Sequence, residues 1–317
     1  MKRRSLTIVA PVYNERQIIG DFHRRVSFVL QQLSSSFDAK ILFVVDRSSD
    51  GTLELLRNIA AQDSCVQIVS LSSRFGHQMS LLAGIDCAKE ADLIIMMDSD
   101  LQHPPEIIPV LLREHDKGSD IVYTVRTDTV GGNTLRKAAG DLFYRLLGYL
   151  SRVPIRKNAA DFCLISRRVA NVFRNGIRER NMFLRGLLSW VGFTQSAVEF
   201  KAEARGGGES KYTLSRTFGL AASAILSFSI KPLQVGIFLG LSVAALSVLL
   251  MALTVVKYFI DKSIPSGWST LAILILLFSG VQLTMMGILG AYIGGIYEEV
   301  KGRPHYIIDE TVNVSYE

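Results

Sequence analysis

The stretch ADLIIMMDSDLQHPPE, residues 91–106, decides the fold that the sequence predicts. An apolar, β-prone run ends at Asp98 and Asp100, and a helical pattern begins near residue 105. A continuous apolar run of this kind is typical of a strand buried on both faces of a parallel sheet. Ligands of such sheets bind beyond the carboxyl ends of the strands, so the two aspartates stand where a ligand is expected.

The same alternation of strand and helix fills the first 125 residues of the chain. Apolar strand-like runs lie at 6–13, 40–46, 66–71, 91–98 and 120–125, and helical patterns lie at 17–33, 52–62, 77–89 and 105–117. Strands separated by helices predict an α/β domain with a mostly parallel, Rossmann-like sheet that is covered on both faces. The first turn reads PVYNE where a dinucleotide-binding domain needs GxGxxG, which disfavours a dinucleotide cofactor.

Composition excludes several classes of protein. The 317 residues are 49% hydrophobic and 20% charged, with a mean hydropathy of +0.27. The chain is too apolar to be disordered and too charged to lie wholly in a bilayer. Its net charge of +6 suits anionic partners such as nucleotides, phosphates and acidic lipid headgroups. Cys65, Cys87 and Cys163 lack a CxxC spacing, so we expect no disulfide framework or zinc cluster, and a reducing compartment.

The apolar residues are concentrated in the C-terminal third. Residues 232–256 and 268–293 carry no charge, and each run exceeds the roughly 20 residues that cross a bilayer. We expect a transmembrane hairpin over 231–297 rather than two buried core helices. Lys and Arg flank its outer ends more than its loop, which places the N-terminal domain in the cytoplasm. Residues 213–230 predict an amphipathic interfacial helix, with a surface helix on the soluble domain as the alternative.

The C-terminal tail, residues 298–317, is expected on the cytoplasmic side and is β-prone after Pro304. We expect it to pair as a strand with a neighbouring subunit, and inert disorder is the alternative.

The pair Asp98 and Asp100 predicts a metal site. Because they lie two residues apart at an expected strand end, both side chains can face the same way. Two carboxylates with room for water and a diphosphate suit Mg²⁺ or Mn²⁺, which would neutralise charge on a leaving nucleoside diphosphate. A lone DxD is often only a solvated turn, but its place after a buried strand and before Gln102 favours a site.

Seven motifs in order resemble a known family. They are APVYNE (10–15), VVDRSSDGT (44–52), FGHQMSLLAGID (75–86), DSDLQHPPE (98–106), ADFCLISRR (160–168), ERNMFLRGLLSWVGF (179–193) and RGGGESKYTLSR (205–216). This series resembles GT-A glycosyltransferases of family 2. With the two apolar spans, it is similar to polyprenyl-phosphate glycosyltransferases of the dolichyl-phosphate-mannose synthase type, and most similar to bacterial GtrB-like undecaprenyl-phosphate glucosyltransferases. The resemblance covers nearly the whole chain.

The resemblance implies a GT-A catalytic domain over residues 1–212 and an integral protein of the cytoplasmic (inner) membrane. It implies inverting transfer of a hexose, most of all glucose from UDP-glucose, to a polyprenyl phosphate at the cytoplasmic face. We expect a homo-oligomer and no nucleic-acid partner. The polyprenyl phosphate is already anionic near neutral pH and needs no strong base, but it needs alignment and cations.

Site residues are carried over by motif. The metal, Mg²⁺ or Mn²⁺, is expected on Asp98, Asp100 and Gln102. The nucleotide-sugar is expected to contact Pro11, Tyr13, Glu15, Asp46, Asp98, Arg205 and Lys211. The acceptor phosphate is expected to contact Arg126, Arg136, Lys137 and Arg205. The expected catalytic residues are Asp98, Asp100, Arg126 and Asp161.

Alternative roles remain for several of these residues. The cations are otherwise solvated surface charges, and Asp161 otherwise caps a helix or is structural. His77 and His103 are expected to make plain hydrogen bonds, and Trp190 and Phe193 are expected in the core rather than on a sugar.

The chain departs from the family pattern at three places. The usual acidic pair after the second strand is Val45-Asp46 here and the following glycine is Arg47, so only Asp46 can contact the nucleoside. The usual RNFG is SRFG at 73–76, and a serine that often precedes the FY of the middle helix is Gly140.

The same fold serves transfer of mannose from GDP-mannose and processive polysaccharide synthesis, but a processive synthase carries a QxxRW motif and more spans. A non-catalytic membrane scaffold or transporter subunit is disfavoured by the intact DSD and by spans without ionisable residues.

Overall fold

The computed structural model describes residues 3–127, 159–180, 182–201 and 267–314, together with scattered positions between 233 and 256. The chain divides into two compact units. The first contains 1–148, 153–213 and 303–317, and the second contains 149–152 and 214–302. The first is an α/β unit.

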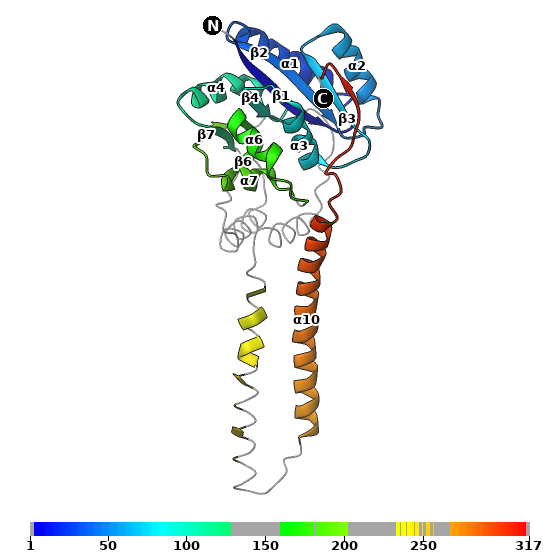
Figure 1. The fold of residues 1–317 in the computed structure, drawn as a ribbon, viewed down its shortest axis with the longest axis vertical. Coiled ribbons are helices and arrows are strands. Elements are labelled where there is room, and N and C mark those ends of the chain that lie inside the picture. Colours follow the sequence, from blue (N-terminus) through cyan, green and yellow to red (C-terminus); the bar gives the residue numbers. More distant parts are fainter. Residues whose placement is uncertain are drawn as a thin grey trace. The chain divides into compact units, whose positions relative to one another are not determined.

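An eight-stranded sheet forms the α/β unit, in the order β7-β5-β6-β4-β1-β2-β3-β8 (Figure 1). The strands are β1 (Arg4–Val12), β2 (Phe37–Val45), β3 (Val66–Leu71), β4 (Leu93–Met96), β5 (Ile121–Arg126), β6 (Ala159–Ser166), β7 (Gln195–Phe200) and β8 (Ile308–Val312). β1 pairs parallel with β2 and β4, β2 with β3, and β5 with β7. β6 runs antiparallel to β4 and β5, and β8 runs antiparallel to β3. The mostly parallel α/β sheet is therefore confirmed.

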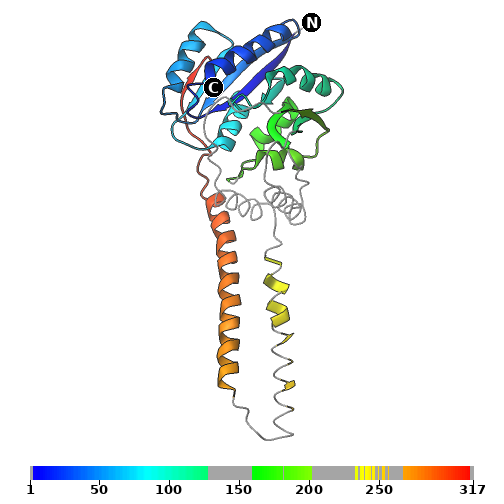
Figure 2. The ribbon, with the colours of Figure 1, turned by 180° about the vertical axis from the view of Figure 1, so that it is seen from behind.

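Helices cover both faces of this sheet (Figures 1 and 2). They are α1 (Ile19–Leu33), α2 (Thr52–Gln62), α3 (His77–Cys87), the short 3₁₀ helix η1 (Pro105–Ile107), α4 (Ile108–Asp116), α6 (Arg167–Asn175) and α7 (Leu184–Trp190). The apolar faces of α1, α2 and α4 form one buried cluster with alternate residues of the strands, such as Leu6, Ile8 and Ala10 of β1. This alternation is what a strand buried on both faces requires, because successive side chains point to opposite faces.

On the other face, α3 lies unusually close to β1. A Cβ built on Gly84 would come within 2.2 Å of Cγ1 of Val9, a distance that real atoms do not tolerate. Both residues are buried. Gly84 therefore lets α3 approach the sheet, and this approach carries the first residue of the helix, His77, to the carboxyl edge of the strands.

Most elements of the first half of the chain lie where the sequence predicts them. The strand expected at 91–98 is shorter than expected, because β4 ends at Met96 and the two aspartates belong to the following turn. β6 and β7 were not predicted. β6 carries the ADFCLIS motif, and the edge strand β7 is only six residues long, with Val198 and Phe200 buried.

The C-terminal tail corrects one expectation. It does form a strand, but β8 pairs with β3 of the same chain rather than with a neighbouring subunit. Arg57 binds Glu310 through two nitrogens at 3.0 and 2.7 Å, and the Tyr306 hydroxyl donates to Asp86 at 2.5 Å. The tail thus completes the edge of the α/β sheet, so the sequence that builds this unit is discontinuous.

The second unit contains the apolar helix α10 (Trp268–Val300). Within the described residues, one stretch, Phe278–Val300, is long and apolar enough to cross a membrane by length and composition. The expected span at 232–256 is described only at scattered helical positions, so two spans are not confirmed. The expected interfacial helix at 213–230 lies outside the described residues.

Candidate active site

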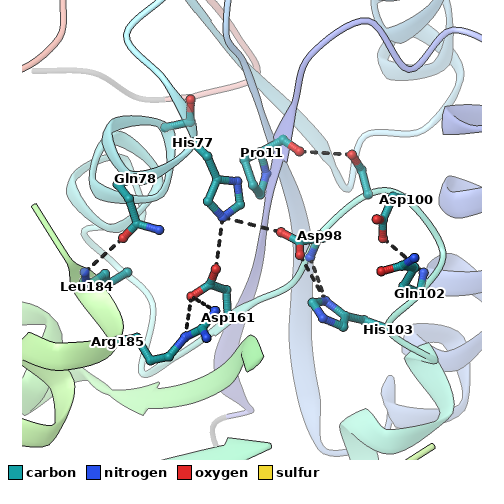
Figure 3. A network of polar contacts seen from close by, with 12 residues as sticks. Pro11, His77, Gln78, Asp98, Asp100, Gln102, His103, Asp161, Leu184 and Arg185 are labelled. Atoms are coloured by element: carbon teal, nitrogen blue, oxygen red, sulfur yellow. Dashed lines mark hydrogen bonds and ion pairs between the residues drawn. The ribbon is translucent and has the colours of Figure 1, made fainter. Parts of the chain in front are cut away.

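Polar side chains gather at the carboxyl end of β4 (Figure 3). Because β6 runs antiparallel to β4, with Met96 opposite Cys163, the beginning of β6 lies beside the end of β4. This places Asp161 of β6 across from Asp98. The first turn of α3 brings His77 between the two carboxylates. The site is therefore assembled from three segments that are distant in the sequence.

His77 lies between two carboxylates. Its Nε2 is 3.5 Å from Oδ1 of Asp98 and 3.5 Å from Oδ2 of Asp161. Burial of the imidazole opposes its protonation, but the hydrogen bond with Asp161 and the charges of Asp98 and Asp161 outweigh burial and raise the pKa of His77. The expectation of a plain hydrogen-bonding histidine understates this position.

Asp161 contacts both a histidine and an arginine of the site. Besides His77, it contacts Arg185 of α7, whose Nη2 lies 3.0 Å from Oδ1. Burial acts to raise the pKa of Asp161, but the hydrogen bond with His77 and the charge of Arg185 outweigh it and lower the pKa. Asp161 is therefore a carboxylate at neutral pH. It lies on a strand and so does not cap a helix, which removes that alternative.

His103 supports the turn that carries Asp98. The backbone N–H of Asp98 donates to Nδ1 of His103 at 3.0 Å, so this nitrogen is an acceptor. The imidazole is only 4% exposed and stacks on Phe162 with ring centroids 5.2 Å apart. Burial lowers the pKa of His103, in agreement with a neutral ring. Burial also raises the pKa of Asp98, which Asp161 and Asp100 reinforce by like charge.

The two aspartates of the DSD turn make different contacts. Because the turn lies beyond β4, Asp98 points toward His77 and His103, whereas Asp100 accepts from the backbone N–H of Gln102 at 3.1 Å (Figure 3). The turn is closed by Leu101 at φ 64° and by the hydroxyl of Ser99, which donates to the carbonyl of Pro11 at 3.0 Å. Asp98 thus lies near two histidines, and Asp100 contacts the backbone of its own turn.

Arg126 and Gln102 contact each other. Nη2 of Arg126 donates to Oε1 of Gln102 at 2.9 Å, while the buried Nε of Arg126 has no hydrogen-bond partner in the described part of the chain. A buried guanidinium nitrogen without a partner is costly unless a ligand or water satisfies it. Arg126 at the end of β5 is therefore suited to receive an anion.

A divalent metal fits this turn only with help from the substrate. Among the described residues, no group of three or more His, Cys, Asp or Glu side chains is arranged to hold a metal ion. The available donors are the carboxylates of Asp98 and Asp100 and the amide oxygen of Gln102. Mg²⁺ is commonly bound by one or two carboxylates with substrate phosphates and water, so this hard-oxygen donor set fits it.

Asp46, expected to contact the nucleoside, is used by the chain itself. It is 4% exposed, and its two oxygens accept from the backbone N–H groups of Phe75 and Gly76 at 2.7 and 2.9 Å. These bonds hold the SRFG turn immediately before α3. Whether Asp46 also contacts a nucleoside stays a prediction.

The beginning of the nucleotide side is formed by the PVYNE segment. The guanidinium of Arg74 lies over the ring of Tyr13, 4.0 Å from its centroid. The backbone N–H of Glu15 donates to Oγ1 of Thr52 at 3.1 Å. Pro11, Tyr13 and Glu15 are thus held at the carboxyl end of β1, on the same edge of the sheet as the DSD turn.

The other expected site residues, Arg136, Lys137, Arg205 and Lys211, lie outside the described residues, as does Gly140. Trp190 is 61% exposed, so its expected place in the core is wrong, while Phe193 is half-buried with Arg168 5.3 Å above its ring. Sequence reasoning missed Arg185. Its signal is the ERNMFLRGLLSWVGF motif, which carries an arginine among apolar residues.

Comparison with known proteins gives consistent matches. The model for "Glycosyl transferase family 2" matches residues 7–173. The "Uncharacterized glycosyltransferase YkcC" of Bacillus subtilis is 38% identical, covering 97% of this chain and 94% of that protein. The "SfII prophage-derived bactoprenol glucosyl transferase" of Shigella flexneri is 37% identical, covering 96% of this chain and 98% of that protein. The "Prophage bactoprenol glucosyl transferase homolog" of Escherichia coli K12 is 35% identical, over 96% and 98%.

Proposed function

This chain belongs to glycosyl transferase family 2, and we propose that it transfers glucose from UDP-glucose to a polyprenyl phosphate with inversion at the anomeric carbon. The observation that carries the proposal is the near full-length match to bactoprenol glucosyl transferases, 37% identical over 96% of this chain. The match includes the C-terminal third. The DSD turn, Asp161 and Arg126 supply a site of suitable chemistry.

In the proposed reaction, an acceptor phosphate oxygen forms a bond to C1 of the sugar while the bond from C1 to the diphosphate breaks. A phosphate monoester has a second pKa near 6, so the acceptor is mostly ionised near neutral pH and no side chain must remove a proton. The protein has to align the two reactants and reduce the repulsion between their charges. This explains a site that is rich in positioning contacts.

The DSD turn is proposed to face the diphosphate of the donor. Asp98, Asp100 and Gln102 would hold Mg²⁺ or Mn²⁺, which supplies charge neutralisation on the leaving nucleoside diphosphate when bound. Pro11, Tyr13, Glu15 and Asp46 are proposed to cradle the nucleoside, as the family resemblance implies.

Arg126 is proposed to bind a phosphate oxygen through its Nε, because a planar guanidinium group donates to phosphate oxygens from two nitrogens. Arg136, Lys137, Arg205 and Lys211 are proposed as further cations for the donor and acceptor phosphates, from their places in the sequence. Asp161 is proposed to position the sugar.

The membrane arrangement is also proposed. The apolar helix ending at Val300 and the uncharged run at 232–256 would form a hairpin in the cytoplasmic membrane, with the α/β unit in the cytoplasm. The polyprenyl chain of the acceptor would then remain in the bilayer while its phosphate reaches the site. A homo-oligomer is compatible with this arrangement.

The proposal is tested by incubating the purified full chain with undecaprenyl phosphate, Mn²⁺ or Mg²⁺ and single nucleotide-sugars, then weighing the lipid product by mass spectrometry. UDP-glucose is expected to give a lipid heavier by one hexose. UDP-galactose and GDP-mannose in separate reactions serve as matched donors. A product with GDP-mannose alone would refute the donor assignment, and no product with any donor would refute the lipid acceptor.

A further inference from the structure

Side chains from α3, β6 and α7 make a connected set of contacts across the candidate site (Figure 3). His77 of α3 faces Asp161 of β6 at 3.5 Å, and Arg185 of α7 faces the other oxygen of Asp161 at 3.0 Å. Next to His77, Oε1 of Gln78 accepts from the backbone N–H of Leu184 at 2.9 Å. The helix start is therefore fixed to β6 and α7 at two successive residues.

The backbone before His77 is held as firmly. Asp46 accepts from the N–H groups of Phe75 and Gly76, and Gly76 adopts φ 93°, a conformation that a side chain would strain. Because the turn is anchored to the end of β2, the imidazole leaves α3 from a fixed point. Its position between the strands is therefore set by the fold and needs no substrate.

The same imidazole nitrogen also faces the donor side of the site. Nε2 of His77 lies 3.5 Å from Oδ1 of Asp98, in the turn after β4, the strand that pairs with the one carrying Asp161. Without a hydrogen-bond donor between them, these two carboxylates would repel each other across a partly buried gap. The N–H group of the His77 ring therefore lies between the two aspartates and offsets the repulsion that would move them apart.

We propose that His77 is a positioning residue that holds Asp161 opposite Asp98, and so sets the alignment of the acceptor with the sugar. His77, Asp161 and Arg185 are called the clasp. The part of the inference that concerns acceptor and sugar rests on the proposed function. The clasp itself rests only on the contacts between these three residues and does not depend on the reaction.

The test compares His77→Ala with His77→Gln in the transfer assay. Loss of alignment by about 1 Å can cost on the order of 100-fold in rate, so we expect His77→Ala to lower kcat by roughly 10- to 100-fold. The KM for the nucleotide-sugar is expected to change much less than kcat. The amide nitrogen of glutamine can replace Nε2 as a donor, so His77→Gln is expected to regain most of the rate.

A matched control is His115→Ala. Nδ1 of His115 lies 2.7 Å from the carbonyl oxygen of Ser119, just before β5 begins. This contact is at the amino end of β5, away from the DSD turn. Its loss is expected to leave kcat unchanged. If His77→Ala instead raises KM and leaves kcat unchanged, or if glutamine restores nothing, the positioning role is overturned.

A double-mutant cycle adds the decisive comparison. In His77→Ala/Asp161→Asn, kcat is expected to be no lower than in Asp161→Asn alone, since His77 acts through Asp161. Rate losses that multiply would overturn the clasp.

The wild-type chain, His77→Ala, Asp161→Asn and the double variant are also compared by thermal unfolding, which needs no substrate. Midpoint shifts that are less than additive would support contact between His77 and Asp161, and fully additive shifts would overturn it. If the wild-type chain transfers no sugar, the proposed function fails, and the unfolding cycle still decides the clasp.

Discussion

Replacing Asp46 with asparagine tests whether this buried carboxylate holds the SRFG turn, apart from any contact that it makes with a nucleoside. Its oxygens accept two backbone N–H groups at 2.7 and 2.9 Å, and the residue is 4% exposed. Asparagine keeps one acceptor and turns an NH₂ group toward the other N–H. One charge-assisted bond of about 1.5–3 kcal/mol is lost, and a buried N–H loses its partner. We expect the free energy of unfolding to fall by roughly 2–4 kcal/mol.

For a domain of this size, each kcal/mol moves the unfolding midpoint by about 2–4 °C, so the midpoint should fall by roughly 4–16 °C. The assay is thermal unfolding of the purified full chain, followed by circular dichroism at one scan rate. Asp38→Asn, an exposed carboxylate at the other end of β2, is the matched control and should change the stability by less than about 0.5 kcal/mol.

The refuting result for Asp46→Asn is an unchanged midpoint. That result would mean that the SRFG turn holds without the carboxylate.

Three further predictions follow from packing. Gly84→Ala forces a Cβ against buried Val9, and such overpacking should destabilise the α/β unit by about 1–3 kcal/mol in the same unfolding assay. A thiol reagent should label exposed Cys65 in the native chain before buried Cys163, whose pKa is raised by burial, as read by peptide mass spectrometry. Deleting residues 304–317 should lower the unfolding midpoint, because β3 loses its antiparallel partner β8.

Each of these predictions has its own control. Gly20→Ala in α1, where a new Cβ would meet nothing within 4 Å, should not destabilise, and equal losses at both glycines would contradict the close approach of α3. Urea should make the three thiols equally reactive. Cys87, whose pKa burial raises to about 12, should lag behind Cys65 in the native protein, and early labelling of Cys87 would contradict the fold. A truncated chain with the wild-type midpoint would show that β8 adds no stability.

The sequence predicts the first half of the sheet because each strand there is a nearly continuous apolar run between clear helical patterns. The edge strand β7 lacks this signal, since QSAVEF is only six residues long and half of them are polar. β8 was recognisable as β-prone, but a strand pattern does not name its partner. β8 and its partner β3 are more than 200 residues apart in the sequence, so no local pattern indicates that they pair.

The sequence predicts only those parts of the candidate site that lie in local motifs. Asp98, Asp100 and Asp161 lie in motifs that stand out locally. The place of His77 between two of these carboxylates depends on how β6 and α3 meet, and spacing along the chain carries no such information. The sequence pattern also places the end of the strand too late, because β4 stops at Met96, before the DSD turn begins.

The central claim is that sugar transfer takes place at the DSD turn. The most direct measurement is transfer from UDP-glucose to undecaprenyl phosphate by Asp100→Ala, measured beside the wild-type chain at saturating Mn²⁺. We predict a loss of at least about 100-fold, as expected when a group that stabilises the leaving diphosphate is removed. Transfer that continues undiminished in Asp100→Ala would contradict the assignment of this turn.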